Sequence, residues 1–228
     1  MLYNKLYGLE FMKGALKGVK GATVLPWRVY HSPDEFKPEH FPNAPRLLIR
    51  TNFPGNSTEV THIVLPRSEI CRRSNGKMLP RVKMREMIRY YPTAPPQFIV
   101  HGVEPRSAYP LSIELRNSKG KIAIIVQATD SQSTIWKVSG RAVVVADNFK
   151  EAYADLVEHG KMSEKDATKL VGNLKCAYKA MLKKLRKDGH ELKRVEFETS
   201  AALRIDKPTE PEFYDFLIKK TNVKTKPK

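Results

Sequence analysis

Residues 163–189 read "SEKDATKLVGNLKCAYKAMLKKLRKDG", and this stretch predicts a long amphipathic helix. Ser163 and Asp166 form a variant of the capping box, in which a hydroxyl and a carboxylate satisfy free backbone donors at a helix start. Apolar side chains then recur every three or four positions, at Ala167, Leu170, Val171, Leu174, Ala177, Tyr178, Met181, Leu182 and Leu185. Gly189 is expected to cap the end of the helix. Several lysines should lie away from the apolar face, namely Lys165, Lys169, Lys179, Lys183 and Lys187.

Segments rich in β-branched residues on either side of this helix predict a sheet for it to cover. They are residues 97–103, 111–115, 121–128 and 134–146 before the helix and 192–200 after it. Two shorter strands are expected nearer the N-terminus, "RLLIRT" (46–51) and "VTHIVLP" (60–66). The fold class is therefore α+β, with a mixed or mainly antiparallel sheet covered by a long amphipathic helix.

Three regions are expected along the chain. Residues 1–96 should form an N-terminal α/β portion with a basic loop, and residues 97–218 a β-rich body with the long helix. Residues 219–228 are a basic stretch that we expect to be disordered.

Charge is the strongest compositional signal. The chain has 41 Lys and Arg against 24 Asp and Glu, a net charge of +17. Such a field attracts anions, which include nucleic acid, polyphosphate nucleotides and acidic proteins. The alternative is a solvated lysine-rich surface, although such surfaces usually balance Lys with Glu.

Other classes of protein find no support in the sequence. No apolar run approaches the ~18–20 residues of a membrane span, and the N-terminus lacks the apolar block of a signal peptide, so a cytoplasmic location is expected. The two cysteines, Cys71 and Cys176, make neither a disulfide framework nor a zinc cluster. The glycine-rich signatures of the common nucleotide-binding loops are absent, and so are zinc-binding histidine pairs and serine-nucleophile elbows.

The segment "RLLIRTNFPG" (46–55) brings an aliphatic strand to an end at Arg50, next to a turn. A guanidinium in that place suits an enzyme that holds a polyphosphate, or a basic protein that holds a nucleic-acid backbone. His101, in the strand "FIVHGV", reads on its own as a structural histidine.

Several segments together resemble a known family. They are "KGVKGA" (17–22) with "VLPWRVYHSPDEF" (24–36), "LLIRTNFPGN" (47–56), "QFIVHGVEP" (97–105), "MSEKDATKLVGNLKCAYKAML" (162–182) and "RVEFETS" (194–200). Their order resembles that of the nucleotide-binding domain of the phosphoenolpyruvate synthase and pyruvate phosphate dikinase family, which has an ATP-grasp fold. The chain departs from the family's motifs in places: Thr51 and Asn52 stand where the family has serines, and His101 stands where it has glutamine.

The resemblance implies an ATP-binding or polyphosphate-nucleotide-binding protein, a divergent phosphotransferase or ligase, with ATP and Mg²⁺ as cofactors. Lys20 and Arg50 would neutralise the phosphates, with Arg50 as the catalytic residue, and His101 and Glu104 would lie on the strand next to the adenine. The implied magnesium ligands are Glu196, Glu198 and Asp215, since hard oxygen ligands suit that ion. Without the resemblance, Glu196 and Glu198 read equally well as a solvent-facing acidic pair.

A basic nucleic-acid-binding protein without catalytic activity is the alternative, with RNA or single-stranded DNA as the partner. Residues 66–96 are rich in arginine and lysine interleaved with two tyrosines that could stack on unpaired bases. The residues concerned are Arg72, Arg73, Lys77, Arg81, Lys83, Arg85, Arg89, Tyr90 and Tyr91. No recognised RNA-binding motif accompanies them.

Overall fold

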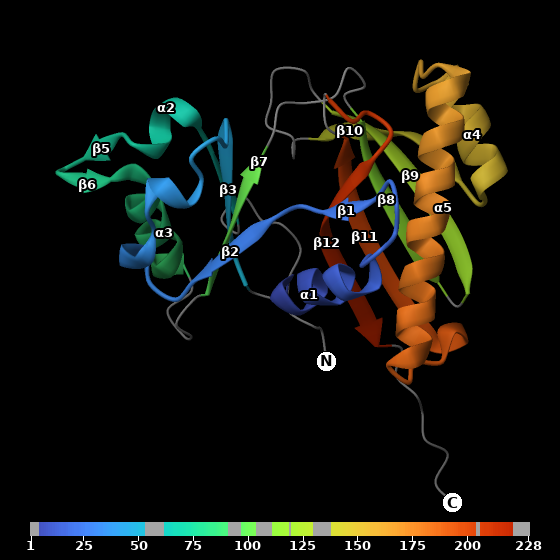
Figure 1. Ribbon diagram of the computed structural model, residues 1–228, viewed down its shortest axis with the longest axis horizontal. Helices are drawn as coiled ribbons and strands as arrows, with labels where there is room; N and C mark the ends of the chain where they lie inside the picture. The colour runs from blue at the N-terminus through green and yellow to red at the C-terminus, as the bar shows by residue number, and fades with distance from the viewer. Residues whose placement is uncertain are drawn as a thin grey trace, which may run out of the picture. The chain divides into compact units, whose positions relative to one another are not determined.

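The structure, a computed structural model, describes residues 5–52, 62–90, 97–103, 111–118, 120–129, 138–203 and 206–220. The chain divides into two compact units (Figure 1). The N-terminal unit consists mainly of residues 25–105, and the C-terminal unit mainly of residues 7–24 and 106–228. This division differs from the expected one, because the strand at 98–103 falls in the N-terminal unit and residues 7–24 fall in the unit that contains the long helix.

The N-terminal unit is built on a four-stranded antiparallel sheet in the order β2-β7-β3-β4. Its strands are β2 (Trp27–Tyr30), β3 (Arg46–Thr51), β4 (His62–Pro66) and β7 (Phe98–Val103). One face of the sheet is covered by short helices and turns, namely η1 (Pro33–Glu35), η2 (Pro38–His40), α2 (Arg67–Ile70) and α3 (Leu79–Tyr90). The core between them contains Leu47, Ile49, Phe98 and Val100 from the sheet and Phe36 from the cover.

Between α2 and α3 the chain forms a two-stranded hairpin, β5 (Arg73–Ser74) and β6 (Lys77–Met78). The two residues of its turn both have positive φ, 51° at Asn75 and 73° at Gly76. Asn-Gly is the preferred pair for such a two-residue turn, because the turn needs left-handed backbone at both positions. The sequence analysis predicted a basic loop in the N-terminal portion, and the Asn-Gly pair is the local signal that indicates a hairpin within it.

The C-terminal unit is built on a six-stranded mixed sheet in the order β1-β12-β11-β8-β9-β10. The short β1 runs parallel to β12, and the other neighbours are antiparallel. The strands are β1 (Thr23–Val24), β8 (Leu111–Ser118), β9 (Lys121–Thr129), β10 (Val138–Ala146), β11 (Val195–Leu203) and β12 (Pro211–Lys220), with η3 (Leu192–Arg194) leading into β11.

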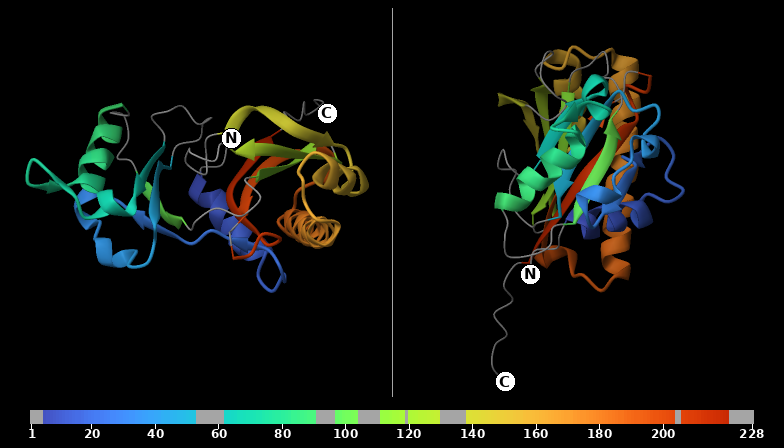
Figure 2. Two further views of the ribbon diagram at one scale, coloured as in Figure 1. Left: turned by 90° about the horizontal axis from the view of Figure 1, so that it is seen from above. Right: turned by 90° about the vertical axis from the view of Figure 1, so that its left-hand side faces the viewer.

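One face of this sheet is covered by α1 (Lys5–Ala15), α4 (Phe149–Glu158) and α5 (Glu164–Lys187) (Figure 2). Burial alternates along the whole of β11, as expected of a strand with one face in a core. Phe197 of β11 contacts Tyr178 of α5, and Phe216 of β12 stacks on Phe11 of α1 with ring centroids 4.4 Å apart. The opposite face carries the half-buried side chains of β11.

The structure confirms the predicted ends of the long helix. The Ser163 hydroxyl accepts the backbone N–H of Asp166 at 3.2 Å. At the other end Gly189 has φ of +84°, its N–H donates to the carbonyl of Arg186, and the N–H of His190 donates to that of Leu185. This pair of bonds is a Schellman motif, which satisfies carbonyls that have no partner inside the helix.

The predicted fold class is confirmed: the protein is α+β, with mixed and antiparallel sheets and a long amphipathic helix packed on one of them. None of the helices in the described part of the chain combines the length and apolarity needed to cross a membrane.

Candidate functional site

The candidate site in the N-terminal unit lies on the face of the four-stranded sheet that α3 does not cover. In the register of β3 with β7, Leu48 pairs with His101 and Arg50 pairs with Ile99. Side chains of directly paired residues share a face, and alternate residues of a strand return to it. Arg50 and His101 are therefore diagonal neighbours on one face, and the structure brings these two predicted site residues together.

His101 is fully buried, at 0% exposure. Within the described residues neither of its ring nitrogens makes a hydrogen bond of ordinary geometry, although the backbone of Leu25 and Pro26 lies close enough to favour the protonated ring weakly. Burial lowers the pKa of His101 to about 3, and the charge of nearby Arg50 acts in the same direction. The imidazole is therefore neutral at physiological pH, with one N–H donor and one acceptor to offer.

Arg50 is 5% exposed, although a guanidinium is always charged. The strand end that carries it is held firmly by Asn52. The Asn52 N–H donates to the Gln97 carbonyl at 2.9 Å, and its side-chain amide donates to the Gln97 amide oxygen at 2.7 Å. The end of β3 that carries Arg50 is therefore anchored to the residue that precedes β7.

The N-terminal unit contains a further buried cation that the sequence did not predict. Lys5, at the start of α1, is only 3% exposed. The next residue, Leu6, donates its backbone N–H to the Asn52 side chain at 2.8 Å, so this end of α1 meets the end of β3. No sequence signal marked Lys5, because a lysine in an amphipathic helix ordinarily lies in solvent.

The other predicted nucleotide contacts are placed differently. Lys20 is exposed in the turn after α1 and belongs to the C-terminal unit. The following residue, Gly21, has φ of +75°, and a side chain there would collide with Asn173 of α5. Glu104 lies outside the described residues.

The predicted magnesium ligands lie on one face of the six-stranded sheet. Glu196 and Glu198 alternate along β11 on its half-buried face, and Asp215 of β12 is in register with Ser200 on that same face. Ser118 donates to the Glu196 carboxylate at 3.3 Å. Carboxylate oxygens are the donors that Mg²⁺ prefers. Within the described residues, however, no three His, Cys, Asp or Glu side chains are grouped closely enough to hold a metal ion.

Arg116 of β8 places a positive charge on this acidic face. It is directly opposite Glu198 in the register of β8 with β11, and its guanidinium donates to Glu114 two residues away. The hydrogen bond to Glu114, together with the charges of Glu114 and Glu198, raises the pKa of Arg116 above its ordinary value. A divalent cation bound at Glu198 would have to share that carboxylate with Arg116.

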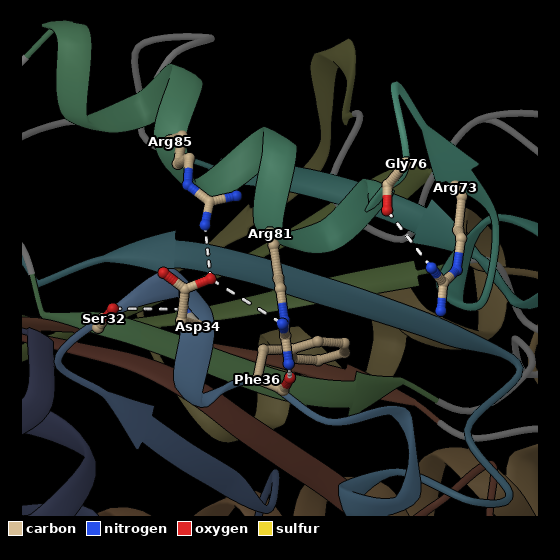
Figure 3. A network of polar contacts seen from close by, with 7 residues as sticks. All are labelled: Ser32, Asp34, Phe36, Arg73, Gly76, Arg81 and Arg85. Carbon is tan, nitrogen blue, oxygen red and sulfur yellow. Dashed lines mark hydrogen bonds and ion pairs between the residues drawn. The ribbon is translucent and has the colours of Figure 1, made fainter.

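The basic segment predicted for nucleic acid is tied into the N-terminal unit by several of its own charges (Figure 3). Arg81 donates twice to the Phe36 carbonyl, at 2.8 and 3.1 Å, and Arg85 pairs with Asp34. These contacts fix η1 against α3. Two further pairs are Arg72 with Glu69, at 2.7 Å, and Lys83 with Glu86, at 2.8 Å.

The remaining basic residues of this segment are exposed to solvent. Arg73 reaches the Gly76 carbonyl of its own hairpin at 3.4 Å, and Lys77 and Arg89 are exposed. Tyr91 and the side chain of Tyr90 lie outside the described residues.

Comparison with known proteins shows a similarity in structure. No protein-family model matches the sequence, and no curated protein sequence matches it. The D-cycloserine synthetase DcsG matches 94% of this chain with a TM-score of 0.54 and 14% identity. An ADP complex of the N5-carboxyaminoimidazole ribonucleotide synthetase purK matches 94% of it with a TM-score of 0.51 and 12% identity.

The chain spans 61% of the length of the first of these proteins and 44% of the second. Both neighbours are ATP-grasp enzymes, and identities this low show the fold alone. The likeness to the phosphoenolpyruvate synthase and pyruvate phosphate dikinase family stays one of sequence motifs. The fold of this chain is that of the ATP-grasp proteins.

Proposed function

We propose that this protein binds ATP, or another nucleotide polyphosphate, through the face of the four-stranded sheet that carries Arg50 and His101. The observation that supports this most is the burial of a guanidinium and a neutral histidine as neighbours on one face of the sheet. Removing such polar groups from water is costly, so their placement together favours a role in binding. The ATP-grasp fold supports the same proposal.

The two side chains suit different parts of a nucleotide. A guanidinium can donate two parallel hydrogen bonds to phosphate oxygens, and such charge-assisted bonds are about twice as strong as neutral ones. Neutral His101 has no charge to give, but its donor and acceptor match the hydrogen-bonding edge of a base. Arg50 is therefore proposed for the phosphates, and His101 for the base.

The C-terminal unit carries further proposed groups of its own. Lys20 is proposed as a phosphate contact, and Glu196, Glu198 and Asp215 are proposed as ligands of Mg²⁺. When bound, Mg²⁺ would supply charge neutralisation for the phosphates. Arg116 would hold the acidic face in its metal-free form by balancing Glu198.

The reaction class proposed for these groups is that of an ATP-dependent ligase or phosphotransferase. Phosphoryl transfer depends mainly on positioning and on neutralising charge, which is what Arg50, Lys20 and the carboxylates offer. The acceptor substrate is not part of the proposal.

A thermal-shift measurement tests nucleotide binding. ATP with Mg²⁺ at about 100 times its Kd should stabilise the folded protein by about 2.7 kcal/mol. For a chain of this size that corresponds to a rise in Tm of roughly 5–10 °C. Arg50→Met, which removes the charge and keeps much of the volume, should abolish most of this shift.

Arg73→Met is the matched control, because Arg73 is exposed on the β5–β6 hairpin. It should leave the ATP shift unchanged. A full ATP shift in Arg50→Met, with a far-ultraviolet circular dichroism spectrum like that of the wild type, would refute the role assigned to Arg50.

Nucleic-acid binding through residues 66–96 receives less support from the structure. Arg72, Arg81, Lys83 and Arg85 already contact carboxylates or a carbonyl of the N-terminal unit. On α5, by contrast, the exposed basic side chains make no ion pair within the described residues.

A further inference from the structure

The outward face of α5 is a row of cations. Its exposed basic residues are Lys165, Lys169, Lys175, Lys179, Lys183, Arg186 and Lys187. The first and last are 22 residues apart, which at 1.5 Å per residue makes a row of about 33 Å. Figure 1 shows α5 running along the six-stranded sheet. We call these seven residues the lysine row.

Carboxylates are scarce along the lysine row. After Asp166 the next acidic residue in the sequence is Asp188, just beyond the end of α5. Asp188 accepts from Lys184, which is not a member of the row, at 2.9 Å. Within the part of the chain that the structure describes, no ion pair involves any of the seven.

Repulsion between the cations of this row lowers the stability of the isolated protein. Lys175, Lys179, Lys183 and Lys187 follow one another at intervals of four, and like charges so spaced repel by about 0.2–0.5 kcal/mol per pair. The basic residues near the end of the helix benefit from its dipole, but those in the middle do not. The row is therefore poorly explained by helix stability.

The other exposed residues of this face narrow the choice of partner. They include Thr168, Gly172 and Cys176, which are small and offer no large apolar anchor. The apolar face of α5, including Leu170, Leu174, Met181 and Leu185, is buried in its own unit. A membrane-surface helix needs that face for the lipid, and a protein interface usually needs aromatic or aliphatic anchors.

We propose that the lysine row binds the sugar-phosphate backbone of a nucleic-acid duplex, without regard to sequence. Backbone binding needs cations and no apolar anchor. The exposed face of α5 carries no aromatic side chain on which unpaired bases could stack, which favours a duplex over a single strand. The length of the row, about 33 Å, is close to the roughly 34 Å of one duplex turn.

Fluorescence anisotropy with a labelled 24-base-pair duplex tests the proposal. The test variant carries Lys175→Gln, Lys179→Gln and Lys183→Gln. Each phosphate contact contributes about −0.9 to the slope of log K against log salt, so the slope should become shallower by about 2.7. At 0.15 M salt the affinity should fall on the order of 100-fold.

The control variant removes the same charge from exposed lysines outside the row, with Lys37→Gln, Lys77→Gln and Lys121→Gln. It should change the affinity and the slope by less than a third as much. Equal effects in the two variants would show a diffuse response to net charge and would overturn the proposal. An unlabelled single strand of the same length should compete less well than the duplex, and better competition by the single strand would also overturn it.

The two cysteines allow the bound duplex to be located. Both are exposed, Cys176 within the lysine row and Cys71 next to Arg72 in the basic segment of the N-terminal unit. With Cys71→Ser, a fluorophore on Cys176 should change its emission when duplex is added. With Cys176→Ser, a fluorophore on Cys71 should not. A response at Cys71 alone, or at neither position, would contradict the proposal, and these outcomes are independent of nucleotide binding.

Discussion

Acid should destabilise the N-terminal unit through His101. The pKa of His101 in the folded protein is about 3, against 6.5 for an exposed histidine, because the ring is buried beside Arg50. The unfolded chain therefore takes up a proton on this residue between about pH 6.5 and pH 3, while the folded chain does not. Since the unfolded state binds more protons in this window, the free energy of unfolding falls as the pH falls.

The size of the effect follows from the two pKa values. Between pH 7 and pH 5 the histidine alone should lower the free energy of unfolding by about 2 kcal/mol. Urea unfolding at the two pH values, followed by circular dichroism, measures the total change. That total also includes the other histidines and the carboxylates, so it must be compared with a variant.

His101→Gln is that variant, because glutamine keeps a donor and an acceptor but does not titrate. Its stability should fall by about 2 kcal/mol less than that of the wild type over the same pH range. His159→Gln is the control, because His159 is exposed, and it should follow the wild type. If His101→Gln and the wild type lose equal stability between pH 7 and pH 5, the burial argument for His101 is wrong.

Four substitutions test the packing within the two units by urea unfolding or Tm. Gly8→Ala should lower the free energy of unfolding by more than about 2 kcal/mol, because its new methyl group would lie 2.2 Å from a backbone oxygen of β12. Gly172→Ala, with nothing within 4 Å of the new methyl group, should stabilise α5 by about 0.5–1 kcal/mol. Equal effects of the two substitutions would contradict the close approach of α1 to β12. Arg81→Met should cost about 1–2 kcal/mol, since it removes two hydrogen bonds to a backbone carbonyl, and a neutral result would mean that the contacts of Figure 3 do not hold η1. Tyr178→Phe should cost about 1–2 kcal/mol because it removes the hydroxyl that donates to buried Asn117 at 3.0 Å, and an unchanged stability would count against that bond.

The sequence predicted the long helix and most strands because their patterns are local. The Ser163 cap, the apolar repeat and Gly189 lie within one segment, and the structure confirms the helix between them. The strand at 46–51 was likewise confirmed. Local patterns do not say which strands pair, so the grouping of β7 with β3 in the N-terminal unit could not be read from them.

The candidate site was predictable only in part, for the same reason. Arg50 stood out in the sequence because it ends an aliphatic run, but its place beside His101 depends on the register of two strands 51 residues apart in sequence, at positions 50 and 101. Lys5 gave no signal at all, since its burial is a tertiary effect. The Asn75-Gly76 hairpin is different, because the Asn-Gly pair is a strong local signal within a segment otherwise dominated by basic residues.

The most direct test of the central claim is the affinity of the protein for ATP and for AMP, measured by isothermal titration calorimetry in the wild type and in Arg50→Met. If Arg50 holds the phosphates beyond the first, the wild type should prefer ATP. The substitution should then weaken ATP binding about 10–100-fold, while AMP binding changes little. An unchanged preference for ATP in Arg50→Met, or no binding of ATP by the wild type, would contradict the account.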